Sequence, residues 1–165
     1  MPGYVIHLAV GKVYFQHNKI KDIESFKKGI MAPDMHEDKS KSHYGPYSSS
    51  PGIKEFLDQK GISDSYDEGY FLHLLTDYLF YNKFLDKWEK SIYDDYDIIN
   101  ENIIKKYGIE IPDQIQEKVR FKQGNLSILN EEDVYKFIEL VGRLNIRKII
   151  SKKGNKVEEL DFEDK

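Results

Sequence analysis

The chain has 165 residues and no cysteine, which fits one domain with its own hydrophobic core and excludes a disulfide framework or a thiolate metal site. Its formal net charge of −4 gives no electrostatic reason to expect nucleic acid or an anionic membrane as a partner. No apolar run reaches the length of a membrane span, and the first residues lack the basic segment and cleavage site of a signal peptide. We therefore expect a soluble, cytoplasmic protein with no transmembrane segment.

Apolar residues recur at helical spacing along most of the chain. This pattern predicts an all-α fold, a compact multi-helix single domain over residues 1–150, followed by a charged, flexible tail over residues 151–165. In chain order, the predicted helices are 4–16, one from Asp22 capped by Asp22 or Ser25, 51–60 capped by Ser49 or Ser50, one from Ser63 or Asp64 to Lys90, 93–107, a weaker one over 112–122, and 131–150 capped by Asn130.

Residues 31–52 interrupt the helical pattern. The stretch contains three Pro, two Gly and five Ser and has almost no apolar period, so it predicts a long loop. Loops beyond about 15 residues in a compact domain are usually functional or disordered. The loop carries two histidines and two aspartates, among them Asp34, directly after Pro33, and His43, and this content favours a functional role. Alternatively, Asp34 is an ordinary turn or cap residue. His36 in the same loop, and His17 before it, are weaker candidates.

The most apolar stretch of the chain, residues 69–80, contains His73 and Asp77. Residues four apart lie on one face of a helix, so both side chains point the same way. The helix is apolar all round, which is typical of a buried helix, and an unpaired buried carboxylate would cost several kcal/mol. A metal ion removes that cost, because neutral imidazole and carboxylate are its natural ligands. Alternatively, the two side chains bond to each other or cap a neighbouring helix.

His7 lies in the apolar helix predicted over residues 4–16, where a lone histidine is more often a satisfied core residue than a ligand. However, Gly11 follows His7 by four residues, and Gly69 precedes His73 by four, so each glycine shares a face with a histidine. Glycine inside a helix costs roughly 0.5–1 kcal/mol relative to alanine. We hypothesise that the two glycines allow a close helix approach and leave room for an ion or its substrate.

Taken in order, these residues resemble a known family of metalloenzymes. His7, the Ala-Pro-Asp of 32–34, the Ser-His-Tyr of 42–44 and the Gly-Tyr-Phe-Leu-His-Leu-Leu-Thr-Asp of 69–77 are similar to the motifs of the zinc-dependent phospholipase C family, in particular its small bacterial members. Zinc-dependent single-strand nucleases use the same all-α fold. The resemblance covers roughly the first 90 residues, and its most specific element is the His-x-x-x-Asp of the helix.

The resemblance implies roles for five residues. Asp34, His43, His73 and Asp77 would be the four ligands of a first zinc ion. Asp77 would also bridge to a second zinc, for which His7 would be a ligand. A bridging water is the nucleophile in the family, and the resemblance implies that Asp34 assists it as a catalytic general base.

The sequence also departs from the family. No histidine follows His73, so the family's third zinc site cannot be built, and no tryptophan lies near the start to bind metal through its amine. We therefore expect one firmly bound divalent metal and a second, weaker one, with zinc favoured and iron or manganese also admitted by these ligands. A second cation would leave the site positively charged and favour an anionic ligand such as phosphate. The predicted reaction is hydrolysis of a small phosphoester or a phospholipid head group.

Three alternatives remain open at this level. The first is a metal phosphohydrolase of the HD type, although the chain has no adjacent His-Asp pair. The second is a non-catalytic domain with a structural metal, which a closed shell of four ligands would indicate. The third is nucleic-acid binding through a basic cluster, which otherwise reads as a solvated helix end. That cluster consists of Arg143, Arg147, Lys148, Lys152 and Lys153. The pattern does not predict an oligomeric state.

Overall fold

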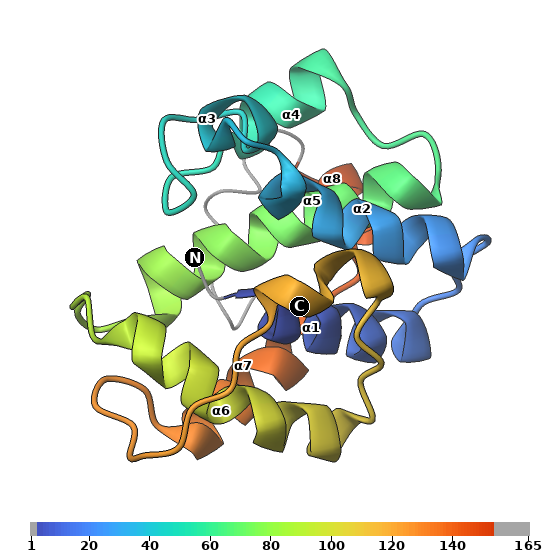
Figure 1. Ribbon diagram of the computed structural model, residues 1–165. Coiled ribbons are helices and arrows are strands. Elements are labelled where there is room, and N and C mark those ends of the chain that lie inside the picture. Colours follow the sequence, from blue (N-terminus) through green and yellow to red (C-terminus); the bar gives the residue numbers. More distant parts are fainter. Residues whose placement is uncertain (1–2, 154–165) are drawn as a thin grey trace.

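The computed structural model describes residues 3–153, and within this range the chain forms helices and no strand, which confirms the all-α prediction (Figure 1). Most of the predicted tail lies outside the described residues. No helix within residues 3–153 has the length and apolar content to cross a bilayer. The elements are α1 (Gly3–His17), α2 (Ile23–Met35), α3 (Lys39–Ser42), α4 (Ile53–Gln59), α5 (Ser65–Leu79), the π-helical turn η1 (Phe80–Phe84), α6 (Ile92–Tyr107), the 3₁₀ turn η2 (Asp113–Lys118), α7 (Glu131–Gly142) and α8 (Ile146–Lys153).

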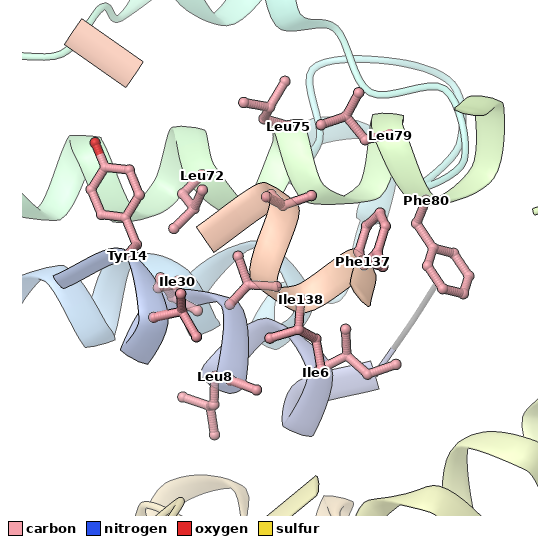
Figure 2. Close-up of a cluster of buried hydrophobic side chains, with 14 of the residues drawn as sticks. Ile6, Leu8, Tyr14, Ile30, Leu72, Leu75, Leu79, Phe80, Phe137 and Ile138 are labelled. Atoms are coloured by element: carbon pink, nitrogen blue, oxygen red, sulfur yellow. The ribbon is translucent and has the colours of Figure 1, made fainter. Parts of the chain in front are cut away.

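Helix α1 lies at the centre of the domain. Its residues are apolar on every face, and the stretch from Tyr4 to Val10 is buried without a break. The helix packs against α2, α5, α6 and α7. Figure 2 shows Ile6 and Leu8 of α1 in one cluster with residues of α2, α5 and α7. Because α1 is enclosed by four helices, any polar side chain that it carries inward is removed from water.

Helices α2 and α5 approach until their backbones touch. A Cβ atom added to Gly69 would lie 2.1 Å from the carbonyl oxygen of Phe26, and one added to Gly29 would lie 2.0 Å from that of Tyr66. The predicted close approach at Gly69 is therefore confirmed, with Gly29 as an unforeseen partner. The predicted room for an ion beside Gly69 is wrong, because the backbone of α2 fills that space.

The loop predicted over residues 31–52 is shorter than expected. Helix α2 continues through Pro33 and Asp34 and ends at Met35. Pro33 cannot donate the backbone hydrogen bond to the carbonyl of Gly29 that another residue would make at this position, but the helix still continues for two more residues. Asp38 then caps the short helix α3 by accepting hydrogen bonds from the amides of Ser40 and Lys41. Asp34 is thus held by a helix, whereas the sequence analysis placed it in a long loop.

The helix predicted from residue 51 begins at Ile53, and its cap is Gly52 rather than Ser49 or Ser50. Gly52 packs against the carbonyl of Tyr44, where an added Cβ would lie 2.0 Å from the oxygen. The serines were plausible caps by residue type, but this tertiary contact decides the start of the helix.

Two predicted helices end early. The helix expected to reach Lys90 ends at Leu79 and continues only as η1, because residues 86–91 contain no aliphatic side chain to hold further turns on the core. The helix expected over 131–150 is two helices, α7 and α8. Asn145 lies between them and accepts a hydrogen bond from the amide of Lys148 at 3.1 Å, which makes it the cap of α8. The caps predicted at Asp22 and Asn130 are confirmed, and Asp64, one of the two predicted starts of its helix, is the cap of α5.

Candidate metal centre

Four of the predicted site residues meet in the core. Asp34 lies in the last turn of α2, His43 follows α3, and His73 and Asp77 lie one turn apart on α5. One ligand atom from each side chain lies within 4.8 Å of the other three. All four are buried, with at most 3% of any of them exposed. The group is of the kind that can hold a metal ion.

The distances inside the group are short, but they are not hydrogen bonds. The Nε2 atoms of His43 and His73 each lie 3.1 Å from Oδ2 of Asp77, and 3.4 and 3.5 Å from Oδ1 of Asp34. In the described part of the chain, none of these four atoms has a hydrogen-bond partner of acceptable geometry, and Asp34 Oδ2 has none either. Buried polar atoms are nearly always partnered. An ion among them would satisfy the group.

The outer nitrogen of each histidine is fixed by a backbone carbonyl. His73 Nδ1 donates to the carbonyl of Ile30 at 2.6 Å, and His43 Nδ1 donates to that of Lys39 at 3.0 Å. Since the proton of a neutral ring is then on Nδ1, the lone pair is on Nε2 and faces the two carboxylates. This is the tautomer and orientation of metal-binding histidines, whose other nitrogen donates to a carbonyl or carboxylate.

The contact between Ile30 and His73 depends on the close approach of α2 and α5. The short helix α3 is tied to the end of α2 in a similar way. Ser42 Oγ donates to the carbonyl of Pro33 at 2.7 Å, and Lys39 Nζ donates to the carbonyl of Asp34. These bonds hold His43 and Asp34 at a fixed separation.

His7 lies beside the group. Its Nε2 is 2.9 Å from Oδ1 of Asp77, while Oδ2 of Asp77 faces His43 and His73. Burial lowers the pKa of His7, and repulsion from His73 adds to the effect. A neutral His7 donates Nε2–H to the carboxylate and so fixes the orientation of Asp77. The predicted role of His7 as ligand of a second metal stays a prediction.

Without a metal ion, the two carboxylates shift the pKa of the histidine between them and keep their own negative charges. Burial alone would lower the pKa of His73, but Asp34 and Asp77 outweigh it and raise the pKa to about 10. Burial would raise the pKa of Asp34 and of Asp77, but the charge of His73 holds both pKa values below their usual range. Two buried carboxylates thus keep their negative charges, which together match one divalent ion.

A cavity of about 430 Å³ reaches Asp34 from the surface. It lies between the start of α1, the end of α2, α6 and the segment that contains η2. Tyr4 also lines the cavity, although the sequence analysis did not single it out. It precedes His7 by three residues, and this helical spacing could have indicated that Tyr4 lies on the same face as the site. The lining residues are Gly3, Tyr4, Val5, Asp34, Lys39, Tyr93, Tyr96, Asp97, Asn100, Lys118, Val119 and Arg120.

The other candidates lie apart from the group. His17 is exposed at the end of α1, and its Nδ1 contacts the carbonyl of Val13. His36 is exposed, and its Nδ1 accepts a hydrogen bond from the amide of Asp38. In the basic cluster, Arg147 pairs with Glu68 at 3.0 Å, and Arg143 pairs with Glu139 at 3.1 Å. These two cations are already engaged within the chain.

Comparisons of this chain with protein-family models, with curated proteins and with solved structures found no match. The resemblance to the zinc-dependent phospholipase C family therefore rests on the order and spacing of the residues quoted above.

Proposed function

We propose that this chain is a metal-dependent hydrolase of phosphoesters whose divalent ion, zinc or a similar metal, is held by Asp34, His43, His73 and Asp77. One observation carries the proposal: ligand atoms without hydrogen-bond partners in the described residues converge in the core, and one of the four residues, Asp34, lines a cavity that reaches the surface. Imidazole nitrogen and carboxylate oxygen suit zinc and also admit iron or manganese. The ordered resemblance to zinc-dependent phospholipases C supports the same reaction class.

When bound, a divalent ion would supply Lewis-acid catalysis to a phosphoryl group in the cavity. The residues of the chain have separate tasks. His43 and His73 present their Nε2 lone pairs because their Nδ1 protons are held by carbonyls. Asp34 lines the cavity with both carboxylate oxygens unbonded within residues 3–153, so one oxygen can accept a proton from an attacking water. This is the general-base role that the family resemblance implies.

A structural metal is the second candidate, and the number of ligands favours it. Four protein ligands complete the tetrahedral shell that is typical of structural zinc, whereas catalytic zinc usually keeps one open position. The cavity at Asp34 favours hydrolysis, because a purely structural ion needs no path from the surface. Measurement of metal content and of activity on the same samples separates the two roles.

The test uses the purified full chain, with metal measured by elemental analysis. Hydrolysis is measured on a phosphomonoester, a phosphodiester and phospholipid vesicles. We expect about one equivalent of metal in the wild type and its loss, together with activity, in His73→Ala and Asp77→Ala. His17→Ala is the matched control, because His17 lies exposed and outside the group. Full metal in both site variants would refute the metal assignment, and full metal without any hydrolysis in the wild type would indicate a structural ion.

A further inference from the structure

The cavity at Asp34 carries a second set of polar groups besides the metal ligands. We propose that Tyr4, Lys118 and Arg120 form an anion-recognition site that selects a terminal, dianionic phosphate group, so that the preferred substrate is a phosphomonoester. The inference rests on the proposed function, because it assigns the substrate class of the same site. It is carried by one buried hydroxyl without a hydrogen-bond partner and two cations without an ion pair, both judged within residues 3–153, and all three residues line one cavity.

Tyr4 provides the inner part of this anion-recognition site. Its side chain is only 8% exposed, and its hydroxyl has no hydrogen-bond partner among the described residues. The same residue lines the cavity together with Asp34. A phenol can donate one hydrogen bond, and buried polar groups nearly always find a partner. An anionic oxygen in the cavity is a suitable acceptor for this donor.

Lys118 and Arg120 provide the outer part. Both are exposed at the cavity, and no ion pair within residues 3–153 engages either side chain. The backbone is held in place, because Asn100 Nδ2 donates to the carbonyl of Arg120 at 2.9 Å. Lys122, two residues further on, is instead paired with Asp94 at 2.9 Å. The end of η2 and the segment after it thus present to the cavity two cations that form no ion pair within residues 3–153, whereas Lys122 is engaged by Asp94.

The charge of the lining favours an anion. Three cationic side chains line the cavity, those of Lys39, Lys118 and Arg120. Apart from the metal ligand Asp34, the lining contains one carboxylate, that of Asp97. Lys39 already donates to the carbonyls at the end of α2, so it contributes charge rather than a free donor. Arginine binds phosphate through two parallel hydrogen bonds, which favours a terminal phosphate with several free oxygens. A quaternary ammonium head group would place a cation against Lys118 and Arg120 and is disfavoured.

The size of the cavity fits a small ligand. Its volume of about 430 Å³ falls within the roughly 300–1,000 Å³ of ordinary ligand sites. A dianionic phosphate has two plausible sources, a small soluble phosphomonoester or a lipid with a terminal phosphate. Both present the same chemistry to Tyr4 and Arg120, so the experiment must separate them.

The test measures binding of inorganic phosphate to the metal-loaded full chain by titration calorimetry, with the metal content of every sample determined. We expect Tyr4→Phe, and the double variant Lys118→Ala with Arg120→Ala, each to weaken phosphate binding by about tenfold or more at unchanged metal content. Lys122→Ala is the matched control and should bind phosphate as the wild type does. In the double variant, the salt dependence of binding should also be smaller.

Glycerol phosphate and vesicles that contain phosphatidic acid are then each tested as competitors of inorganic phosphate. Competition by glycerol phosphate identifies a soluble phosphomonoester as the source of the phosphate group, and competition by the vesicles identifies a lipid. Variants that keep their metal and bind phosphate like the wild type would overturn this inference and leave the proposed function standing. The inference is also overturned if metal-loaded wild type binds no phosphate. A wild type that takes up no metal would instead overturn the proposed function.

Discussion

The imidazole of His7 stacks on that of His73, with ring centroids 3.6 Å apart and ring planes 6° from parallel. His7 comes from the central helix α1, and His73 comes from α5. The stack leaves Nε2 of His7 in reach of Asp77 Oδ1, and it leaves Nε2 of His73 in reach of Asp77 Oδ2. The carboxylate of Asp77 therefore faces His7 through Oδ1, and it faces His73 and His43 through Oδ2.

Replacing His7 tests whether its hydrogen bond to Oδ1 fixes the orientation of Asp77. His7→Phe keeps an aromatic ring for the stack but removes the donor to Asp77 Oδ1, so the carboxylate loses its fixed orientation. Loss of such an outer partner typically lowers metal affinity by about 10–100-fold. We expect weaker binding at an unchanged stoichiometry, measured by competition with a chelator. His7→Gln, whose amide can still donate, should recover part of the affinity.

The same experiment addresses the predicted second metal. If His7 were a ligand of a second ion, His7→Phe would lower the number of bound ions rather than the affinity for the first. A fall in stoichiometry from two to one would therefore contradict the positioning role and support the ligand role.

Gly69→Ala should destabilise the fold. The added methyl group would lie 2.1 Å from the carbonyl oxygen of Phe26, so α2 and α5 must separate. Overpacking of this kind costs typically about 1–3 kcal/mol, and we expect a value at the upper end, measured by urea unfolding. Gly11→Ala is the comparison, because its methyl group would meet the end of the flexible Ile30 side chain. A Gly69→Ala variant as stable as the wild type would show that the helices can move apart freely.

Asp95 holds a loop that lacks regular structure. Its carboxylate accepts hydrogen bonds from the amides of Ser127, Ile128 and Leu129 at 2.9, 2.7 and 2.9 Å. Asp95→Ala leaves these donors without a partner, so we expect a loss of roughly 3 kcal/mol in the free energy of unfolding. Asp94→Ala removes a neighbouring carboxylate that forms an exposed ion pair, and it should cost less than about 1 kcal/mol. Equal losses in the two variants would contradict the argument.

Asp67 should make stability depend on pH. Burial raises its pKa, but hydrogen bonds from Ser63 and Lys60 outweigh burial and hold the pKa below its usual value. A depressed folded pKa means that the contribution is present above the unfolded pKa of about 4 and is lost as pH falls through the folded value. Asp67→Asn should therefore cost stability at pH 7, and the cost should shrink as pH is lowered below about 4, measured by urea unfolding at a series of pH values. A difference that grows on acidification would contradict this assignment.

Residue type and spacing predicted a large part of the site. His73 and Asp77 stand out because polar residues four apart interrupt a buried helix, and the resemblance added Asp34 and His43 from the loop. The acceptors that orient the histidines were not predictable, because they are backbone carbonyls of Ile30 and Lys39, which any residue carries. Their position depends on tertiary packing.

The parts of the fold that the sequence did not predict also depend on tertiary packing. The closeness of α2 and α5 depends on Gly29 as well as Gly69, and a sequence does not state which glycines face each other. The break between α7 and α8 follows from the cap at Asn145, which sits inside a run that is otherwise helical in its spacing. Tyr4 was missed because a tyrosine among apolar residues looks like an ordinary core residue until the cavity beside it is known.

Asp34 and His43 lie nine residues apart, and the pair on α5 begins thirty residues further along a chain without cysteine. An ion shared by them would act as a cross-link between the end of α2, the segment after α3 and α5. Binding to the folded state alone adds about 2.7 kcal/mol of stability when the free ion is at a hundred times its dissociation constant. The folding equilibrium of this protein would then follow the metal concentration of its surroundings, and a chelator would act on it as a denaturant does.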